Sequence, residues 1–380
     1  MSNQVYINNI AKFLPNEPVS NDEMESILGL VNGKPSRSKN IVLRQNGIKN
    51  RYYVIDKNGN VKFSNAEITA NAIKKLDNKA FSIKDIEVLS CGTSLPDQLL
   101  PSHASMVHGK LGNVPLEVNS PSGVCCAGMH AIKYGYLSIL SEQSRNAVAT
   151  GSEVISTLLR ADKFNKEINC TNQLEQNPIL AFEKDFLRWM LSDGAGAMLM
   201  ENKPNAEGIS LKIEWIETIS YANELDACMY AGSDKDVNGN LIGWREFDPE
   251  LWLEKSIFSV KQDVKLLDKY VVNRCITPLA NILKKRNIDS HKDVNYFLPH
   301  LSSMYFKQKL YDELKTQGIE VTDEKWFTNL TRVGNVGSAS IYIILDELFH
   351  SGNLKKGEKI LIMVPESGRF SYAYAYLTVV

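Results

Sequence analysis

Residues 122–128 read SGVCCAG, a turn of small residues around two adjacent cysteines. The extended segment Leu116–Asn119 runs into it, and an apolar run with helical spacing follows from Cys126 to about Ser141. A strand, a turn of small residues and a helix therefore meet at one point. A thiol at the start of a helix faces unpaired N–H groups and the positive end of the helix dipole, and both lower its pKa. We expect a reactive Cys126, although two buried core cysteines in a tight turn would give the same pattern.

Strand-like and helix-like segments alternate on both sides of this point. This alternation is typical of an α/β fold, and it predicts a mostly parallel sheet. The expected strands are Val5–Ile10, Ile86–Cys91, Leu116–Asn119, Asn146–Thr150 and Ala195–Met200, followed by Ile209–Ile219, Val294–Leu298, Lys359–Val364 and Phe370–Val379.

The second half of the chain repeats the outline of the first. A small-residue turn leads into an apolar helix and then into the strand Asn146–Thr150 in the first half, and into Lys359–Val364 in the second. Both strands end in a loop that contains glycine. A duplicated α/β unit explains this pattern, and chance similarity between generic units is the alternative. We expect an N-terminal half over residues 1–200 and a C-terminal half over residues 201–380.

Composition excludes several classes of function. The 380 residues carry 43 Lys and Arg against 44 Asp and Glu, so no basic excess favours a nucleic-acid partner. No apolar run is long enough to span a membrane, and the N-terminus lacks the features of a secretory signal, so a cytoplasmic protein is expected. The six cysteines lack zinc-ligand spacing, so we expect free thiols and no metal. They are Cys91, Cys125, Cys126, Cys170, Cys228 and Cys275.

Two further segments carry polar side chains at places where chemistry is expected. His300 directly follows an apolar strand, and ligand crevices of α/β sheets lie at such strand ends. Asn335 stands among small residues before an apolar helix. Each has an ordinary alternative, because a lone histidine can cap a helix and an asparagine can be an N-cap.

Taken together, the three segments resemble a known family. Cys126 in Cys-Ala-Gly, His300 in Leu-Pro-His and Asn335 in Gly-Asn-Val-Gly-Ser resemble the Cys-His-Asn triad of the β-ketoacyl-acyl carrier protein (ACP) synthases III of the thiolase superfamily. Three more stretches are similar to the family's conserved segments, and the resemblance spans nearly the whole chain. They are Ser192–Ala197, Arg44–Arg51 and Gly368–Tyr372.

The resemblance implies a thiolase-like five-layer αβαβα fold, built from two similar halves, and a homodimer. It implies that Cys126 takes up an acyl group as a thioester, and that neutral His300 and Asn335 stabilise the enolate of a second thioester. The backbone N–H groups of Cys126 and Arg369 would form the oxyanion hole, with Arg369 at a position where the family has glycine. No cofactor is implied, because ACP or coenzyme A thioesters deliver the acyl groups.

A subgroup resemblance sharpens the expected reaction. The stretches Phe13–Glu23 and Lys34–Ser38 resemble ketosynthases of dialkylresorcinol and flexirubin pathways. In that subgroup, two β-ketoacyl thioesters are joined and closed to a cyclohexanedione. The alternatives are decarboxylative condensation with malonyl-ACP in fatty acid or polyketide synthesis, and O-acyl transfer by the same fold.

More distant alternatives have specific weaknesses. A degradative thiolase needs a second cysteine near the C-terminus, and the last cysteine is Cys275. A hydroxymethylglutaryl-type synthase needs an acidic base, for which Glu153 is the nearest candidate in a Gly-Ser-Glu loop that is ordinary for ketosynthases. O-acyltransferases of this fold tend to carry Asp where this chain has Asn335. A non-catalytic carrier-binding subunit would have lost the triad.

Overall fold

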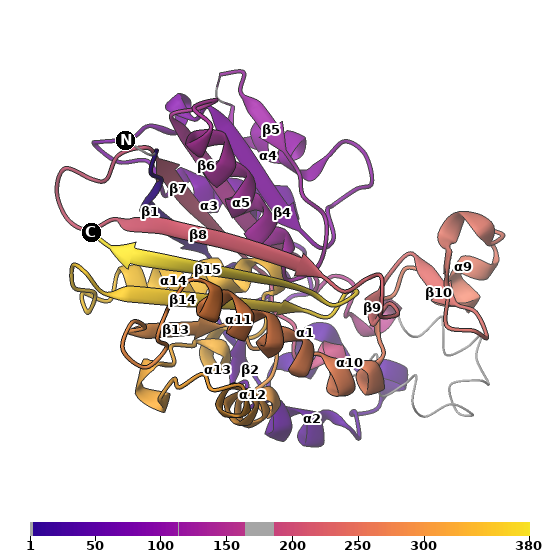
Figure 1. Cartoon of the computed structure of the whole chain (residues 1–380). Coiled ribbons are helices and arrows are strands. Elements are labelled where there is room, and N and C mark those ends of the chain that lie inside the picture. The colour runs from indigo at the N-terminus through magenta and orange to yellow at the C-terminus, as the bar shows by residue number, and fades with distance from the viewer. Residues whose placement is uncertain (1–2, 113, 164–185) are drawn as a thin grey trace.

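The computed structural model describes residues 3–112, 114–163 and 186–380, so Cys170 lies outside the described residues. Within them, one large mixed sheet runs through the molecule in the order β13-β14-β15-β8-β1-β7-β6-β4-β5 (Figure 1). Its strands are β1 (Tyr6–Phe13), β4 (Val88–Thr93), β5 (Glu117–Asn119), β6 (Asn146–Glu153), β7 (Gly194–Glu201), β8 (Leu211–Ser220), β13 (Tyr296–Pro299), β14 (Lys359–Glu366) and β15 (Ser371–Val379).

The sheet contains the same topology twice. In the N-terminal part, β1 pairs antiparallel with β7, β7 pairs antiparallel with β6, and β6 pairs parallel with β4. In the C-terminal part, β8, β15, β14 and β13 repeat this sequence of pairings. The two sets meet where β1 pairs with β8 over a short register, from Tyr6↔Lys212 to Ile7↔Leu211. This symmetry supports the expected division near residue 200, which stays a prediction as a domain boundary.

The expectation of a mostly parallel sheet is wrong. Only the β4–β5, β4–β6 and β13–β14 pairs are parallel, within the residues that the structure describes. The first and last strand of each half run antiparallel to their neighbours. The physical reason is the connection between strands: β14 and β15 are joined by only residues 367–370, and a parallel crossover needs a dozen residues or more.

Helices cover both faces of each half-sheet. One core cluster joins β1, β14 and β15 to the helices α5 (Ala127–Leu140) and α14 (Ser340–Phe349), which lie between the two half-sheets. A second cluster packs α3 (Asn65–Lys74), α4 (His103–Leu111), α11 (Asn273–Lys285) and α12 (Tyr305–Thr316) on the outer faces. The layers therefore alternate as helix, sheet, helix, sheet and helix.

Shorter elements surround this frame, and β9, β10 and α9 project from one end of it (Figure 1). The short strands are β2 (Val19–Ser20), β3 (Asn50–Arg51), β9 (Met229–Tyr230), β10 (Ser233–Lys235), β11 (Leu241–Gly243) and β12 (Lys261–Gln262). The remaining helices are α1 (Met24–Leu28), α2 (Lys39–Asn46), α9 (Leu251–Glu254), α10 (Val264–Tyr270) and α13 (Leu330–Val333), with 3-10 turns η1 (Val31–Gly33), η2 (Ile83–Asp85), η3 (Trp244–Glu246), η4 (Asp323–Lys325) and η5 (Gly337–Ala339).

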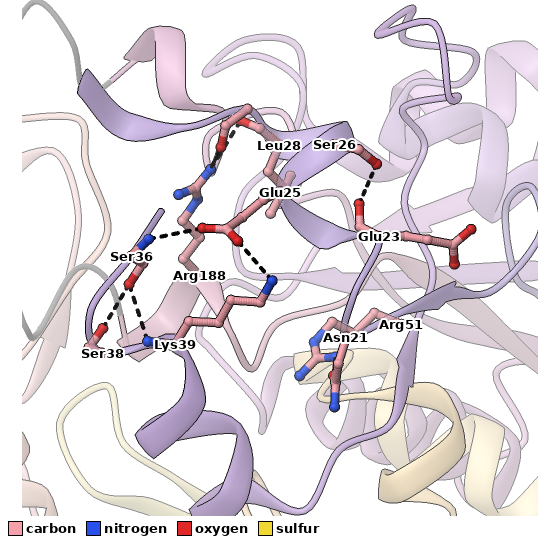
Figure 2. A network of polar contacts seen from close by, with 11 residues as sticks. Asn21, Glu23, Glu25, Ser26, Leu28, Ser36, Ser38, Lys39, Arg51 and Arg188 are labelled. Carbon is pink, nitrogen blue, oxygen red and sulfur yellow. Dashed lines mark hydrogen bonds and ion pairs between the residues drawn. The ribbon is translucent and has the colours of Figure 1, made fainter. Parts of the chain in front are cut away.

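A polar network fastens α1 and α2 to the body of the molecule, as Figure 2 shows. Glu25 of α1 forms an ion pair with Lys39 of α2, with Nζ 2.9 Å from Oε2, and both side chains are largely buried. The buried guanidinium of Arg188 donates to the backbone carbonyls of Leu28 and Leu159. The bond to Leu28 satisfies a carbonyl group that the end of the short helix α1 leaves without an intrahelical partner, and the bond to Leu159 ties the same arginine to the body of the molecule.

Candidate active site

The loop between β5 and α5 is held by a carboxylate from the other half of the chain. Cys126 is the N-cap residue of α5, and its backbone N–H donates to Oε2 of Glu366 at 2.9 Å. The backbone N–H of Val124 donates to the same oxygen, also at 2.9 Å. The thiol of Cys126 is fully buried and donates to the carbonyl of Val364, with Sγ 3.4 Å from the oxygen.

Both neighbouring thiols rest in the protonated form. Burial raises the pKa of Cys126 and of Cys125 well above the usual value, and the negative charge of Glu366 raises both further. The expectation that the helix N-terminus lowers the pKa of Cys126 is therefore wrong for the resting enzyme. Removal of the thiolate from water outweighs the favourable helix dipole, which is worth only about 0.3–2 kcal/mol.

Two cavities meet at this loop. The larger has a volume of about 270 Å³, and its wall includes Cys125, Glu153 and Asn335 together with apolar side chains. The smaller, of about 30 Å³, includes Cys125 and His300. Both also share Ser302 and Ser367. The structure thus brings His300 and Asn335 to adjoining cavities around Cys125, whereas Cys126 lies behind the wall of both.

His300 lies just past the end of β13, as the sequence predicted. Its backbone N–H donates to the carbonyl of Met363 on β14 at 2.8 Å, which continues the parallel ladder. The ring is buried, and within the described chain neither Nδ1 nor Nε2 has a hydrogen-bond partner. Burial lowers the pKa of His300 to about 4, so the imidazole is neutral at physiological pH. A neutral ring with two unused nitrogens can donate one hydrogen bond to a bound carbonyl.

Asn335 is fixed by its backbone and by one side of its amide. Its N–H donates to the carbonyl of Met190 at 3.1 Å, and its carbonyl accepts from the N–H of Ser192 at 2.9 Å. The side-chain oxygen accepts from the N–H of Gly337 at 3.0 Å. No hydrogen bond occupies Nδ2 within the described residues, and Asn335 lines the larger cavity. The amide group can therefore donate to a ligand there.

Further polar contacts fix the segment that pairs with Asn335, which follows the isolated bridge between Leu191 and Asn335. Asp193 is fully buried and accepts from the backbone N–H groups of Val54, Ile155 and Ser156 at 2.7, 2.8 and 2.9 Å. It also accepts from the hydroxyl of Ser156. Burial raises the pKa of Asp193, and these four hydrogen bonds oppose the increase. The turn at residues 192–194 thus links two neighbouring backbone segments behind the site through Asp193.

Comparisons with known proteins agree with this arrangement. Residues 283–376, which include His300 and Asn335, match the family model described as "3-Oxoacyl-[acyl-carrier-protein (ACP)] synthase III C terminal". β-Ketoacyl-[acyl-carrier-protein] synthase III of Clostridium perfringens is 25% identical over 366 residues, which cover 96% of each chain. The enzyme of the same name from Rickettsia prowazekii is 22% identical over 357 residues, or 94% of each chain.

Solved structures share the fold at lower identity. The tetronic acid condensing enzyme AbyA1 superposes with a TM-score of 0.76 and 18% identity, over 98% of this chain and 99% of that chain. A variant of Xanthomonas campestris OleA with bound lauric acid and lauroyl-CoA gives a TM-score of 0.75 at 17% identity, over 100% of both chains. The predicted thiolase-like α/β fold is thereby confirmed.

Along nearly its whole length the chain is similar to β-ketoacyl-ACP synthases III, the family that the sequence resembled. The site also contains two carboxyl groups, Glu153 and Glu366. Oε1 of Glu153 accepts from the N–H and hydroxyl of Ser94 and from the N–H of Ser338. Burial raises the pKa of Glu153 to about 7. Glu366 was missed entirely, because its partners Val124 and Cys126 lie some 240 residues earlier in the chain.

Arg369 does not line either of the two cavities. Its side chain is exposed, and its Nε donates to the carbonyl of Leu225 at 2.9 Å. Gly368 lies closer to the cysteine loop, since an added Cβ on Gly368 would lie 3.0 Å from Val124 Cγ2. The backbone around residues 368 and 369, rather than the arginine side chain, faces the loop.

The described residues contain no group of three or more His, Cys, Asp or Glu side chains that could hold a metal ion. No helix in the described part of the chain is long and apolar enough to cross a membrane.

Proposed function

We propose that this enzyme takes an acyl or β-ketoacyl group from a thioester onto Cys126 and joins it to a second thioester by a Claisen-type condensation. The single observation that carries the proposal is the convergence of a cysteine loop, a neutral buried imidazole and an unoccupied amide on adjoining cavities. Covalent capture on a cysteine divides one difficult reaction into two easier ones.

In the first step, the thiolate of Cys126 attacks the thioester carbonyl and the leaving thiol departs. The N–H of Cys126 and an N–H of the Gly368–Arg369 turn would hold the oxyanion. The thiol must turn away from the carbonyl of Val364 to reach the larger cavity. Cys125 already lines both cavities, so it is the alternative nucleophile and the matched control.

In the second step, His300 and Asn335 donate hydrogen bonds to the thioester carbonyl of the second substrate. Those bonds strengthen as the carbonyl becomes an enolate oxygen, so they lower the barrier to carbon–carbon bond formation. Burial disfavours the charged imidazolium, so His300 stays neutral and can donate a hydrogen bond from one ring nitrogen. Removal of one such donor typically costs about 10²–10³ in rate.

We further propose that the second substrate is a β-ketoacyl thioester and that the product closes to a cyclohexanedione, the precursor of a dialkylresorcinol. The lining of the larger cavity supports a substrate without a free carboxylate. Its wall contains the acidic Glu153 and, among the residues described, no lysine or arginine that could pair with the carboxylate of a malonyl group. Apolar wall residues, including Leu95, Ile155 and Met190, suit an acyl chain.

An acyl carrier protein is the proposed donor, and a homodimer is the proposed assembly. The edge strand β5 supports the dimer, because strand edges pair readily with a second copy. Val118 on this edge is 38% exposed, and Leu99, Leu100 and Leu137 are also exposed. Light scattering would test the assembly, and a purely monomeric chain would exclude it.

Intact-mass analysis of the protein, offered a panel of acyl and β-ketoacyl thioesters, tests the chemistry. Wild type and Cys125→Ala should gain the acyl mass, whereas Cys126→Ala should not. His300→Ala and Asn335→Ala should acylate and then fail to condense. Acylation of Cys126→Ala combined with loss in Cys125→Ala would move the nucleophile to Cys125.

Product mass separates the alternatives. A product that keeps every carbon of two β-ketoacyl groups supports the cyclohexanedione reaction. A product that has lost carbon dioxide from a malonyl group would instead indicate chain initiation, and an ester would indicate O-acyl transfer.

A further inference from the structure

Glu366 is a buried carboxyl group in contact with the cysteine loop. It is the last residue of β14 and only 6% exposed. Its Oε2 accepts the N–H groups of Val124 and Cys126, both at 2.9 Å. The group is confined on both sides: an added Cβ on Gly123 would lie 3.4 Å from Oε2, and one on Gly368 would lie 3.2 Å from Oε1.

No cation balances this carboxylate. Within the described residues, Glu366 forms no ion pair, and backbone N–H groups are its only hydrogen-bond donors. Burial raises the pKa of Glu366, while the two N–H groups oppose that shift. An unpaired buried carboxyl group beside two thiols is costly for stability, and such groups are commonly retained for chemistry.

The carboxylate occupies the place that the reaction intermediate needs. The N–H of Cys126 is one of the two donors proposed for the tetrahedral oxyanion, beside an N–H of the Gly368–Arg369 turn. In the resting enzyme that N–H of Cys126, together with the N–H of Val124, donates to Oε2 of Glu366. An incoming thioester therefore cannot use the N–H of Cys126 until Glu366 gives it up.

The reactive thiol also needs a proton acceptor. Burial keeps Cys126 protonated, and among the described residues its Sγ donates hydrogen bonds to the carbonyls of Val364 and Ser371, which cannot take a proton. The ring nitrogens of His300 have no partner in the described chain, so no histidine is bonded to the thiol. Glu366 is the titratable side chain hydrogen-bonded to the backbone of the same residue, and its negative charge acts on the thiol of Cys126.

We propose that Glu366 accepts the thiol proton of Cys126, and that its protonation releases the N–H of Cys126 to the thioester oxyanion. This inference rests on the proposed acylation of Cys126. A neutral carboxyl oxygen is a weaker acceptor than a carboxylate, because charge-assisted hydrogen bonds are about twice as strong as neutral ones. Proton transfer and opening of the oxyanion hole are thereby one event.

The step balances without any further reactant. The S–H bond of Cys126 breaks and an O–H bond forms on Glu366, while the sulfur electron pair attacks the thioester carbonyl. The tetrahedral intermediate then collapses, the bond from carbonyl carbon to the donor's sulfur breaks, and the donor thiolate takes the proton from Glu366. The acyl-enzyme remains, and the carboxylate returns to its two N–H groups.

Two substitutions test the proposal through the rate of acylation, measured by rapid quench and intact mass. Glu366→Gln keeps the size and the acceptor oxygen but takes no proton, and we expect acylation to slow by about 10²-fold or more. Glu366→Ala leaves a space, and we expect a similar loss that formate restores at least tenfold. Formate should not rescue Glu366→Gln, whose amide fills the space. The surface variant Glu207→Gln is the matched control, and circular dichroism checks that each variant is folded.

The outcomes separate this inference from the function beneath it. Acylation of wild type together with an unchanged rate in Glu366→Gln overturns the role of Glu366 and leaves the ketosynthase proposal standing. A slow Glu366→Ala variant that formate does not rescue also overturns it, because a structural loss is not repaired by a free carboxylate. If wild type takes up no acyl group from any thioester, the proposed function and this inference both fail.

Discussion

Glu153 lends itself to a quantitative experiment because only one of its carboxyl oxygens is engaged. Oε1 accepts three hydrogen bonds, from the N–H and hydroxyl of Ser94 and from the N–H of Ser338. Oε2 has no hydrogen-bond partner among the described residues. In Glu153→Gln, the amide oxygen can keep all three bonds and the charge disappears. The substitution therefore isolates the free energy of holding a buried negative charge.

The expected magnitude follows from the pKa. Burial raises the pKa of Glu153 from 4.5 to about 7, and each pKa unit corresponds to about 1.4 kcal/mol. Since the folded pKa lies above the unfolded one, the folded state binds more protons between these values, and its stability falls as the pH rises through them. The charge should cost about 3 kcal/mol at pH 8 and less than about 1 kcal/mol at pH 5.

Urea unfolding of wild type and Glu153→Gln at pH 5 and pH 8 tests this reasoning. The stability gained by the variant should be about 2 kcal/mol larger at pH 8 than at pH 5. Glu207→Gln, at an exposed glutamate, should show no such difference. A gain of equal size at both pH values would refute the argument, because it would mean that Glu153 is ionised as easily as in the unfolded chain.

Three further outcomes are expected. Gly128→Ala should unfold at a clearly lower temperature than wild type, because its Cβ would lie 2.2 Å from the carbonyl oxygen of Ser338. The control Gly109→Ala, in open space within α4, should stabilise the fold by about 0.5–1 kcal/mol. Equal melting temperatures of the two variants would contradict the close contact at Gly128. Asp193→Asn should lower the free energy of unfolding by at least about 2 kcal/mol. Both carboxylate oxygens accept hydrogen bonds from backbone N–H groups, and an amide group has only one acceptor oxygen. An unchanged midpoint of urea unfolding would contradict this prediction. His300→Gln should lose less unfolding free energy than wild type when the pH falls from 6.5 to 4. In that range the unfolded histidine binds a proton and the folded one, with a pKa of about 4, does not. An equal loss in the variant and in wild type would contradict this prediction.

Local patterns predicted the elements of this fold well and their pairing less well. The helix after Cys126, the strand before His300 and the apolar strand Lys359–Val364 are all present, because periodicity and small-residue turns are local signals. Strand direction was mistaken, although the chain held the necessary signal. The few residues between β14 and β15 permit only a hairpin, so the short connection already required an antiparallel pair.

The chemistry of the site was harder to predict than its residues. His300 and Asn335 lie beside the cysteine loop, yet the protonation state of Cys126 depends on burial and on Glu366, which reaches the loop from the other half of the chain. Neither effect has a signal in the sequence around residue 126. Long-range contacts decide the pKa values here, and a single sequence does not encode them in any local pattern.

The backbone contacts behind α5 have a consequence for how such an enzyme can change over evolutionary time. An added Cβ on Gly128 or Gly151 would lie 2.2 Å from the carbonyl oxygen of Ser338, so this side of the site tolerates almost no variation. The wall of the larger cavity also includes Tyr230 and Gln262, on the two-residue strands β9 and β12. Mutations there can reshape the acyl pocket while the reacting groups stay in register. Substitutions that admit new substrates are therefore expected in the cavity wall, while the reacting groups stay the same.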